Sequence, residues 1–589
     1  MKQPLSERSS FYESPQLFLH LLSMLVGALV VASAVAFMRL IKFFQWLVFG
    51  DAGSLVPVIS GLPWWLVVGG PAIGGLVVGL VFHFLLKEKA GLGVPTVMEA
   101  VAQERSSIPA FRAVVKFFCS ALTIGSGGAA GREGPIVQIG ALLGSFVGRL
   151  FRVTDEYMRI LVACGAAGAI SATFNAPITG VIFAEEIILG EFTLMSLAPI
   201  VLSSVVGAVF SREILGNYEV IHVPAFTVHS PLEVVWYLAL GLLAGVVAAA
   251  FTVSLYKSRD FWDFLRIPPY IKPAIGGLAV GAIGLHWPQV MGLGYDAIST
   301  MLSGWHSLSL VLCLLALKMV ATSLTLGSGG SGGIYAPSFF IGAMTGAAFN
   351  HCVNLVFPGI TAGPEAYSIV GMGAVLAGTT LAPIQAFVII LEMTQNYVIV
   401  VPLIVCCLLS SAVARRIQGE SIYTLQLWRQ GTFLQAGKDM TLLQPIKAGD
   451  VMTCPTESIP ESWTLRQMLR QLVFRRHSCF PVTDDCGNLT GVISLRDLTK
   501  VPKREADLDS MLVKEIASEP ALSVLTDDDL PTVWRRMRKA QIRRAPVVED
   551  CAGFLRLMGM LSQTDILSAY RRAQKTKAIE QVLPLGRRK

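Results

Sequence analysis

A glycine-rich stretch that occurs twice places the strongest constraint on how this chain can fold. The first copy, GSGGAAGREGP, covers Gly125–Pro135, and the second, GSGGSGGIYAP, covers Gly327–Pro337. When the segments that begin at Lys116 and Lys318 are aligned at a constant offset of 202 residues, 13 of 29 positions are identical. Lysine, threonine and proline keep register together with the glycines, so shared composition does not account for the likeness. We infer that the chain contains two copies of one unit.

A second pair of similar segments supports the duplication. FNAPITGVIFAEE at Phe174–Glu186 matches TLAPIQAFVIILE at Thr380–Glu392, and in both an acid follows the proline by nine residues. We therefore predict repeats over about residues 60–210 and 235–415. The residues alone do not show whether the copies are inverted, although inverted repeats are common in transporters.

The composition places both repeats in a membrane. Of the 589 residues, 53% are hydrophobic and 15% charged, with a mean hydropathy of +0.61, which is too apolar for a soluble protein of this size. Eleven apolar stretches lie between Leu17 and Val413. Several are too short, or too rich in glycine and proline, to cross a hydrocarbon core of about 30 Å as one helix. We expect an all-α polytopic membrane domain with broken helices, which in transporters mark the binding site.

The charges predict a separate soluble tail. From Met440 onward there are 24 Lys/Arg and 18 Asp/Glu, against 23 and 22 in the longer remainder. The expected organisation is a cytosolic N-terminal segment, a membrane domain, a linker, two small domains and a basic tail, over residues 1–16, 17–430, 431–446, 447–503, 511–573 and 574–589. The basic excess fits a cytosolic face rather than nucleic-acid binding. The ten cysteines and eight histidines form no disulfide framework or metal spacing, and no enzyme motif is present.

Three segments of the form GxxxP carry the chemistry of the predicted site. They are GLGVP at Gly91–Pro95, GREGP at Gly131–Pro135 and GIYAP at Gly333–Pro337. Proline suits the first turn of a helix, and the preceding glycines let the backbone approach a ligand closely. Helices that start there direct free N–H groups and positive dipole ends at one point, which favours a small anion. A cation would require carboxylate or carbonyl oxygens instead.

Glu133 lies within the second of these segments, where such an anion would bind. Its carboxylate would compete with the anion for the same N–H groups, and protonation would weaken its hold. We therefore predict that Glu133 is a gate and a proton carrier. A structural ion pair or a surface acid is the alternative, although acids inside membranes are usually functional.

GREGP, GIYAP and the tyrosine of GESIYT at Gly419–Thr424 together resemble the signature of the CLC family of chloride channels and proton-coupled chloride antiporters. The resemblance covers about residues 20–425. It implies a homodimer with one anion pathway per subunit, inverted repeats, a gating role for Glu133 and a hydroxyl ligand at Tyr423. The anion-binding residues implied by it are Gly93, Val94, Arg132, Glu133, Gly134, Ile334, Tyr335, Ala336 and Tyr423.

Two positions differ from the family pattern. Leu92 stands where the family motif GSGIP usually has an anion-binding serine, which leaves the preferred anion open. Ile187 stands where many antiporters have an internal proton glutamate, directly after the structural acid Glu186. Glu185 is one residue earlier and should face another direction on a helix. We expect chloride transport with proton-coupled exchange, with a passive voltage- or pH-gated channel as the alternative.

The tail contains a second repeat, in which GVISLRDL at Gly491–Leu498 matches GMLSQTDI at Gly559–Ile566. It resembles a pair of CBS domains of α/β structure. The resemblance implies an adenine nucleotide at the pair, held by Ser494, Asp497, Ser562 and Asp565. Capping of a helix by the SxxD pattern alone is an equal explanation of these residues. The tail could also be a dimerisation clamp without a sensing role.

The remaining expectations concern location and partners. We expect the plasma (cell inner) membrane, with lipid around the body and the tail in the cytosol. Chloride or another small anion, protons and a second copy of the chain are the expected partners, with no metal and no other cofactor. A CBS-containing cation transporter is a remote alternative, because it would need acid clusters that this body lacks.

Overall fold

The computed structural model of the chain divides into two compact units, Met1–Leu434 and Gln435–Lys589. The described residues are 15–88, 91–102, 108–216, 233–302, 304, 306–358, 361–430, 445–454, 458–472, 479–494, 507–518, 520, 522–540, 542, 544–551, 554–566, 568–569 and 572–573.

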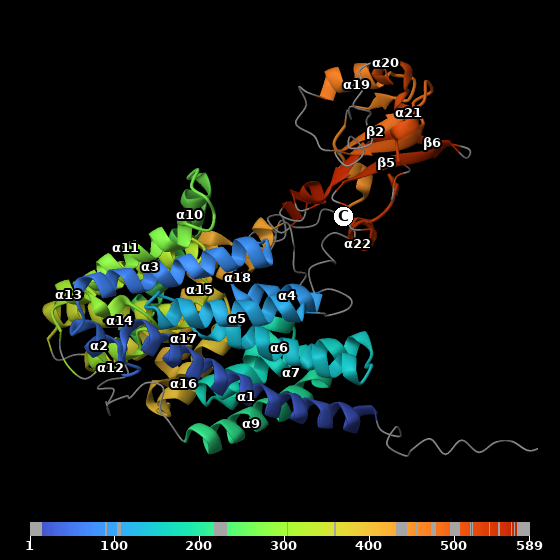
Figure 1. The fold of residues 1–589 in the computed structure, drawn as a ribbon. Coiled ribbons are helices and arrows are strands. Elements are labelled where there is room, and N and C mark those ends of the chain that lie inside the picture. The colour runs from blue at the N-terminus through green and yellow to red at the C-terminus, as the bar shows by residue number, and fades with distance from the viewer. Residues whose placement is uncertain are drawn as a thin grey trace, which may run out of the picture. The chain divides into compact units, whose positions relative to one another are not determined.

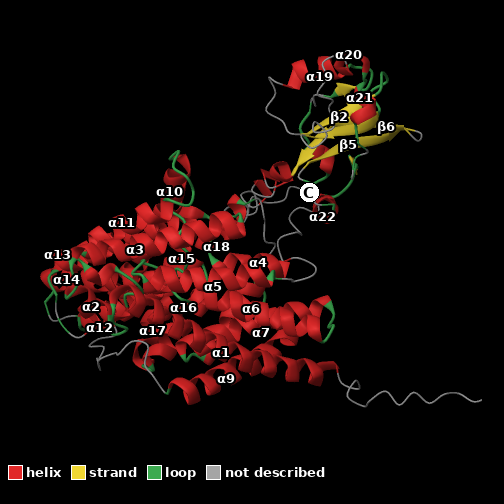
Figure 2. Ribbon diagram, viewed as in Figure 1, coloured by secondary structure: helices red, strands yellow, loops and turns green. Residues whose placement is uncertain are grey.

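The first unit is helical throughout its described residues (Figures 1 and 2). Eight of its helical segments are long and apolar enough to cross a membrane, and several others are shorter, as the broken apolar stretches predict. Its helices are α1 (Pro15–Phe49), α2 (Leu55–Ser60), α3 (Trp64–Leu80), α4 (Gly93–Ala102), α5 (Ala110–Gly125), α6 (Glu133–Leu150), α7 (Asp155–Phe174), α8 (Pro177–Phe183), α9 (Leu194–Leu215), α10 (Val234–Phe264), α11 (Lys272–Gly284), α12 (Tyr295–Leu302), α13 (Leu308–Gly327), α14 (Tyr335–Val356), α15 (Pro364–Thr380), α16 (Pro383–Thr394), α17 (Val400–Gln418) and α18 (Ile422–Arg429). Turns of π-helix extend α3 over Val81–Leu86 and α8 over Ala184–Leu189.

The helices of the two repeats pack in the same way. α6 packs on α7 and α14 on α15, while α3 of the first repeat lies against α11 of the second. α1 contacts α5, α6, α7 and α9, just as α10 contacts α13, α14, α15 and α17. α1 is therefore the first-half counterpart of α10, although no sequence likeness placed it inside the first repeat.

Each repeat contains a helix that breaks at the same position. Asn175 follows the last residue of α7 and Leu381 that of α15, both with a left-handed backbone at φ 55°, and a proline starts the next helix two residues later. A leucine in this conformation is uncommon, because its side chain crowds the backbone there. The two apolar runs that seem continuous in the sequence are therefore each divided into a long and a short helix.

The short helices α8 and α16 each begin on a carboxylate from the other repeat. Glu392 accepts hydrogen bonds from the amides of Ile178 (2.9 Å) and Thr179 (2.6 Å), and from the Thr179 hydroxyl (2.6 Å). Glu186 accepts them from the amides of Ile384 (3.3 Å) and Gln385 (2.7 Å). This reciprocal exchange satisfies N–H groups that a helix start leaves without partners. It also explains why both similar segments end in an acid.

The second unit contains two three-stranded sheets of the same topology. In order β1-β2-β3 and β4-β5-β6, the first pair of strands is parallel and the second antiparallel. The register shifts after Val482 in one sheet and after Val547 in the other, so the copies share even this irregularity. The strands are β1 (Ile459–Pro460), β2 (Cys479–Thr483), β3 (Leu489–Ser494), β4 (Val524–Leu525), β5 (Arg544–Cys551) and β6 (Phe554–Ser562), and the helices α19 (Leu465–Leu472), α20 (Asp507–Ser510), α21 (Val513–Ile516) and α22 (Leu530–Lys539). The α/β duplication predicted for the tail is confirmed.

The exchanged carboxylates should contribute measurably to stability. Substitution Glu392→Ala removes the partner of the exposed Ile178 amide and of the buried Thr179 amide, and an unsatisfied buried polar group such as the latter costs about 1–3 kcal/mol. We expect a lower melting temperature of the detergent-purified protein, followed by size-exclusion chromatography after heating. Glu213→Ala is the control, because Glu213 is exposed in the last turn of α9. Equal melting temperatures for the two variants would contradict this role.

Candidate anion site

The starts of α4, α6 and α14 meet in the interior of the membrane unit. A methyl group on Gly93 would lie 2.4 Å from the Gly134 carbonyl oxygen, and one on Gly134 would lie 3.4 Å from the Gly333 Cα. Side chains larger than hydrogen at Gly93 would therefore separate the helix starts. All three GxxxP segments predicted to converge are brought together, and Gly93, Val94, Gly134, Ile334 and Ala336 are all buried there.

Two backbone hydrogen bonds join the repeats at this point. The Gly131 amide donates to the Gly333 carbonyl (2.8 Å), and the Gly333 amide donates to the Gly131 carbonyl (2.7 Å). The bridge is antiparallel, so the two strands of chain run in opposite directions where they meet. Gly127 and Gly329, four residues before each partner, have φ values of 96° and 115° that favour glycine. The glycine-rich copies are thus the seam between the repeats.

Threonine side chains reinforce the same seam in a reciprocal way. The Ala129 amide donates to Thr325 Oγ1 (3.1 Å), and the Ser331 amide donates to Thr123 Oγ1 (3.3 Å). Both pairs are related by the offset of 202 residues seen in the sequence. Thr123 and Thr325 are aligned in the two copies, and each accepts a backbone hydrogen bond from the glycine-rich loop of the other copy. This shared role accounts for the threonine at this position in both.

The Glu133 carboxylate lies on the start of α14. Its Oε1 accepts a hydrogen bond from the Tyr335 amide at 2.5 Å, and the side chain is 1% exposed. Its Oε2 is buried without a hydrogen-bond partner among the described residues. A methyl group on Gly333 would lie 2.1 Å from Oε1, so only glycine leaves room for the carboxylate. The Glu133 carboxylate of the first repeat is therefore hydrogen-bonded to a backbone N–H group at a helix start of the second repeat, as the position of Glu133 in GREGP predicts.

Two tyrosines and a glutamine lie next to this helix start. The buried Tyr335 hydroxyl donates to Gln385 Oε1 at 3.3 Å. The Tyr423 hydroxyl lies close to that of Tyr335 but without ordinary hydrogen-bond geometry, and Ser421 caps the helix that carries it. Tyr423 is thus brought to the converging helix starts, although it follows GIYAP by more than eighty residues. Gln385 was not predicted; its only signal was a glutamine in the second copy at the position of Thr179 in the first.

Leu92 lies directly before the start of α4 and offers no polar side chain there. Its side chain is 1% exposed, and its amide donates to Gln426 Oε1 at 3.0 Å. The same oxygen accepts a hydrogen bond from Arg259 at 3.2 Å. The Leu92 amide is therefore engaged within the protein, and the contribution of this loop reduces to Gly93 and Val94. Sequence reasoning missed Gln426, which lies three residues beyond Tyr423 on α18.

The acids near the predicted internal proton position face different ways. Ile187 is buried, while Glu186 caps α16. Glu185 is fully buried and accepts a hydrogen bond from Ser196 Oγ of α9 at 2.7 Å, with its Oε2 unpartnered among the described residues. The prediction that Glu185 and Glu186 point in different directions is confirmed.

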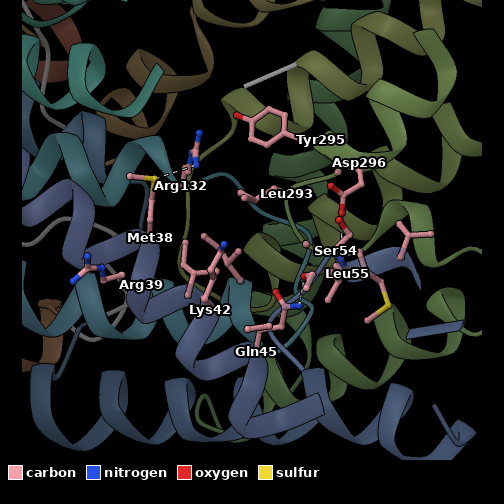
Figure 3. A pocket seen from close by; sticks show the side chains of 18 of the residues that line it. Met38, Arg39, Lys42, Gln45, Ser54, Leu55, Arg132, Leu293, Tyr295 and Asp296 are labelled. Carbon is pink, nitrogen blue, oxygen red and sulfur yellow. Dashed lines mark hydrogen bonds between the residues drawn. The ribbon is translucent and has the colours of Figure 1, made fainter. Parts of the chain in front are cut away.

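Arg132 lines a cavity of about 690 Å³ (Figure 3). Its guanidinium lies over the Tyr295 ring at 5.4 Å and donates to the Thr173 carbonyl at 3.2 Å. Arg39 and Lys42 of α1 also line the cavity, with Asp296 as the acid among the lining residues. Arg132, the residue before Glu133, is therefore placed in a basic cavity.

The predicted nucleotide residues are only partly described. Ser562 and Asp565 are bonded to each other, because the Ser562 hydroxyl donates to Asp565 Oδ2 (2.6 Å) and accepts from the Asp565 amide (3.2 Å). This is the geometry of a helix cap. Ser494 ends β3, its side chain is not described, and Asp497 lies outside the described residues. Within the part of the chain that the structure describes, no cluster of His, Cys, Asp and Glu could hold a metal.

These features define a polytopic membrane protein whose two inverted repeats meet at buried helix starts. Residues 74–415 match the family model described as voltage gated chloride channel, and residues 448–504 and 513–572 match that of the CBS domain. The first match covers more than half of the chain. The chain therefore belongs to the voltage-gated chloride channel (CLC) family and carries a pair of CBS domains.

Related proteins cover the membrane unit. A ClcB-like chloride channel protein of Ralstonia nicotianae is 36% identical over 69% of this chain and 95% of the relative. The H(+)/Cl(-) exchange transporter ClcA of Vibrio parahaemolyticus is 34% identical over 64% of this chain and 82% of the relative. A solved slow cyanobacterial Cl-/H+ antiporter has a TM-score of 0.64 at 26% identity, over 71% of this chain and 98% of that structure. A solved eukaryotic CLC transporter matches 94% of this chain and 99% of its own chain, with a TM-score of 0.63 at 19% identity. At this identity the match shows only that the two proteins share a fold.

Proposed function

We propose that this protein transports chloride across the cell inner membrane as a homodimer, with Glu133 as the gate and with protons exchanged for chloride. The observation that carries the proposal is the Glu133 carboxylate bound to the Tyr335 amide at the junction of the repeats. A negative group already sits on this N–H group, so the position is suited to an anion. The names of the relatives agree with chloride as that anion.

The gate follows from competition for one helix start. A free N–H group and the positive end of the α14 dipole stabilise a negative charge there. Chloride and the ionised carboxylate cannot both occupy this place. When Glu133 takes up a proton its charge is lost, so its hold on the Tyr335 amide weakens and chloride can replace it. Proton uptake and chloride binding at the same residue are the physical basis of exchange.

The basic cavity beside Arg132 supports an approach path to the gate. Arg39, Lys42 and Arg132 outnumber the acid Asp296 among its lining residues. Positive charge along a cavity with low-dielectric walls raises the local concentration of anions. We propose that chloride passes through this cavity before it reaches Glu133.

Proton-coupled exchange requires a path for protons through the protein, whereas passive chloride conduction does not. The named exchanger among the relatives and the solved antiporter support exchange. Ile187 and the ClcB relatives named as channels support conduction, because a buried isoleucine carries no proton. We favour exchange and keep a passive channel as the second candidate function.

Removal of the gate carboxylate should remove the response to pH. In proteoliposomes that contain the full-length protein, chloride flux through Glu133→Ala should persist and no longer change with pH, because no titratable group competes with the anion. Glu156→Gln, an exposed acid in the first turn of α7, is the control and should behave as the wild type. A Glu133→Ala variant with the pH dependence of the wild type would show that Glu133 is not the gate.

Coupling is tested by the reversal potential in crossed chloride and pH gradients. For an exchanger, a pH gradient at constant chloride shifts the reversal potential, since each cycle moves protons as well as anions. The measurement uses wild-type protein in planar bilayers or voltage-clamped vesicles. A reversal potential equal to the chloride Nernst potential at every pH gradient would identify a passive channel.

For the tail, which we place in the cytosol, nucleotide binding stays a prediction. The Ser562–Asp565 cap uses groups that a ribose would need, so a nucleotide must share or break it. We expect Asp565→Ala and Asp497→Ala to weaken ATP binding to the full-length protein about tenfold each, the effect of losing a hydrogen bond to a charged group. Equilibrium dialysis measures it, with the exposed Glu549→Ala as control. If no binding is found at millimolar ATP, ADP and AMP, the SxxD motif only caps a helix and the tail is not a nucleotide sensor.

A further inference from the structure

Two hydrogen-bond donors near the Tyr335 hydroxyl lack an ordinary hydrogen bond in the interior of the membrane unit. Gln385 is 0% and Tyr423 2% exposed. Gln385 Nε2 has no partner among the described residues, and the Tyr423 hydroxyl has the Tyr335 hydroxyl nearby but without ordinary hydrogen-bond geometry. Burial of an unsatisfied donor is costly, and native proteins rarely leave one without a role. Two such donors at one place point to a ligand.

Tyr335 determines which end of the Gln385 amide is free. Its hydroxyl donates to Gln385 Oε1 at 3.3 Å, so the acceptor end is used and both hydrogens of Nε2 remain. The rings of Phe183 and Phe339 lie 6.2 Å from the Tyr335 ring and confine it. The hydroxyl is therefore held in place, and the Nε2 end of the amide is left without a partner among the described residues.

The nearby carboxylates are engaged elsewhere and do not compete for these donors. Glu133 accepts from the Tyr335 amide, and Glu186 accepts from the backbone amides of Ile384 and Gln385. The free groups are an amide NH₂ and a phenol O–H, and the carbonyl end of the amide is taken. A ligand at this place must accept hydrogen bonds, which an anion does and a metal cation does not.

The geometry points to Gln385 as a side-chain ligand of the transported anion, shared with Tyr423, and to Tyr335 as the residue that positions it. This inference rests on the proposed chloride transport and names a determinant of anion affinity and selectivity within it. Gln385 supplies a polar contact at a site where Leu92 offers none from its side chain. It comes from the second repeat, whereas Leu92 belongs to the first.

The test compares variants of the full-length protein. Gln385→Met removes both donors at nearly constant length, and Tyr335→Phe removes a single oxygen atom. We expect Gln385→Met to raise the chloride Kd, measured by calorimetry, about tenfold or more, because a hydrogen bond to a charged group is lost. The chloride-to-nitrate flux ratio in proteoliposomes should change as well. Gln418→Met is the matched control. Gln418 is the last residue of α17, and its side-chain amide already donates to the carbonyl of Ala249 in α10.

Tyr335→Phe should weaken chloride binding less than Gln385→Met, and the double variant should be no weaker than Gln385→Met alone, because the hydroxyl acts through the amide. If Gln385→Met does not fold, Tyr335→Phe still decides by its Kd and flux ratio. Unchanged Kd and flux ratio in a folded variant, with wild-type chloride flux intact, would mean that the free donors bind only water and would overturn the assignment. Absence of chloride flux in the wild type would instead refute the proposed function on which it rests.

Discussion

A helix that begins inside a membrane leaves backbone N–H groups that no water can satisfy, and this requirement governs the membrane unit. The structure meets it across the repeat boundary. Glu186 and Glu392 each cap a helix of the opposite repeat, and Gly131 and Gly333 exchange their backbone hydrogen bonds. The starts of α8 and α16 are therefore each satisfied by the opposite repeat, whereas α7 and α9 are capped within their own repeat by Thr154 and Thr193.

One helix start is satisfied differently, and the difference carries the function we propose. The start of α14 is bound by the Glu133 carboxylate, which in the function we propose is protonated and displaced, whereas the counterpart of Glu133 in the second repeat is Tyr335. The two lysines at aligned positions, Lys116 and Lys318, also have different partners. Lys116 pairs with Glu88 at 3.0 Å, while Lys318 donates to the carbonyls of Val290 and Gly292. The duplicated fold supplies a symmetric frame, and single differences between the repeats within it place a carboxylate on the start of α14.

The sequence predicted the parts of this arrangement that leave a local pattern. The offset of 202 residues identified the seam, and the acid of GREGP identified Glu133, because both lie in glycine- and proline-rich motifs that are repeated along the chain. Gln385 and Gln426 left no such pattern, because each is a single glutamine whose pairing no motif marks. The place of α1 as the partner of α10 was also invisible, because helix packing needs only similar shape and apolar surface. The break at Leu381 was unexpected for a related reason: a leucine rarely adopts a left-handed backbone, and packing imposes it here.

The central claim is that Glu133 and the transported anion compete for the Tyr335 amide. Crystals of the Glu133→Gln variant soaked in bromide test it most directly, because the anomalous signal of bromide locates the anion independently of the protein atoms. We expect a bromide ion beside the Tyr335 amide, where the Glu133 carboxylate lies in the wild type. Bromide bound elsewhere in the membrane unit, with the substituted glutamine side chain still on that amide, would contradict it.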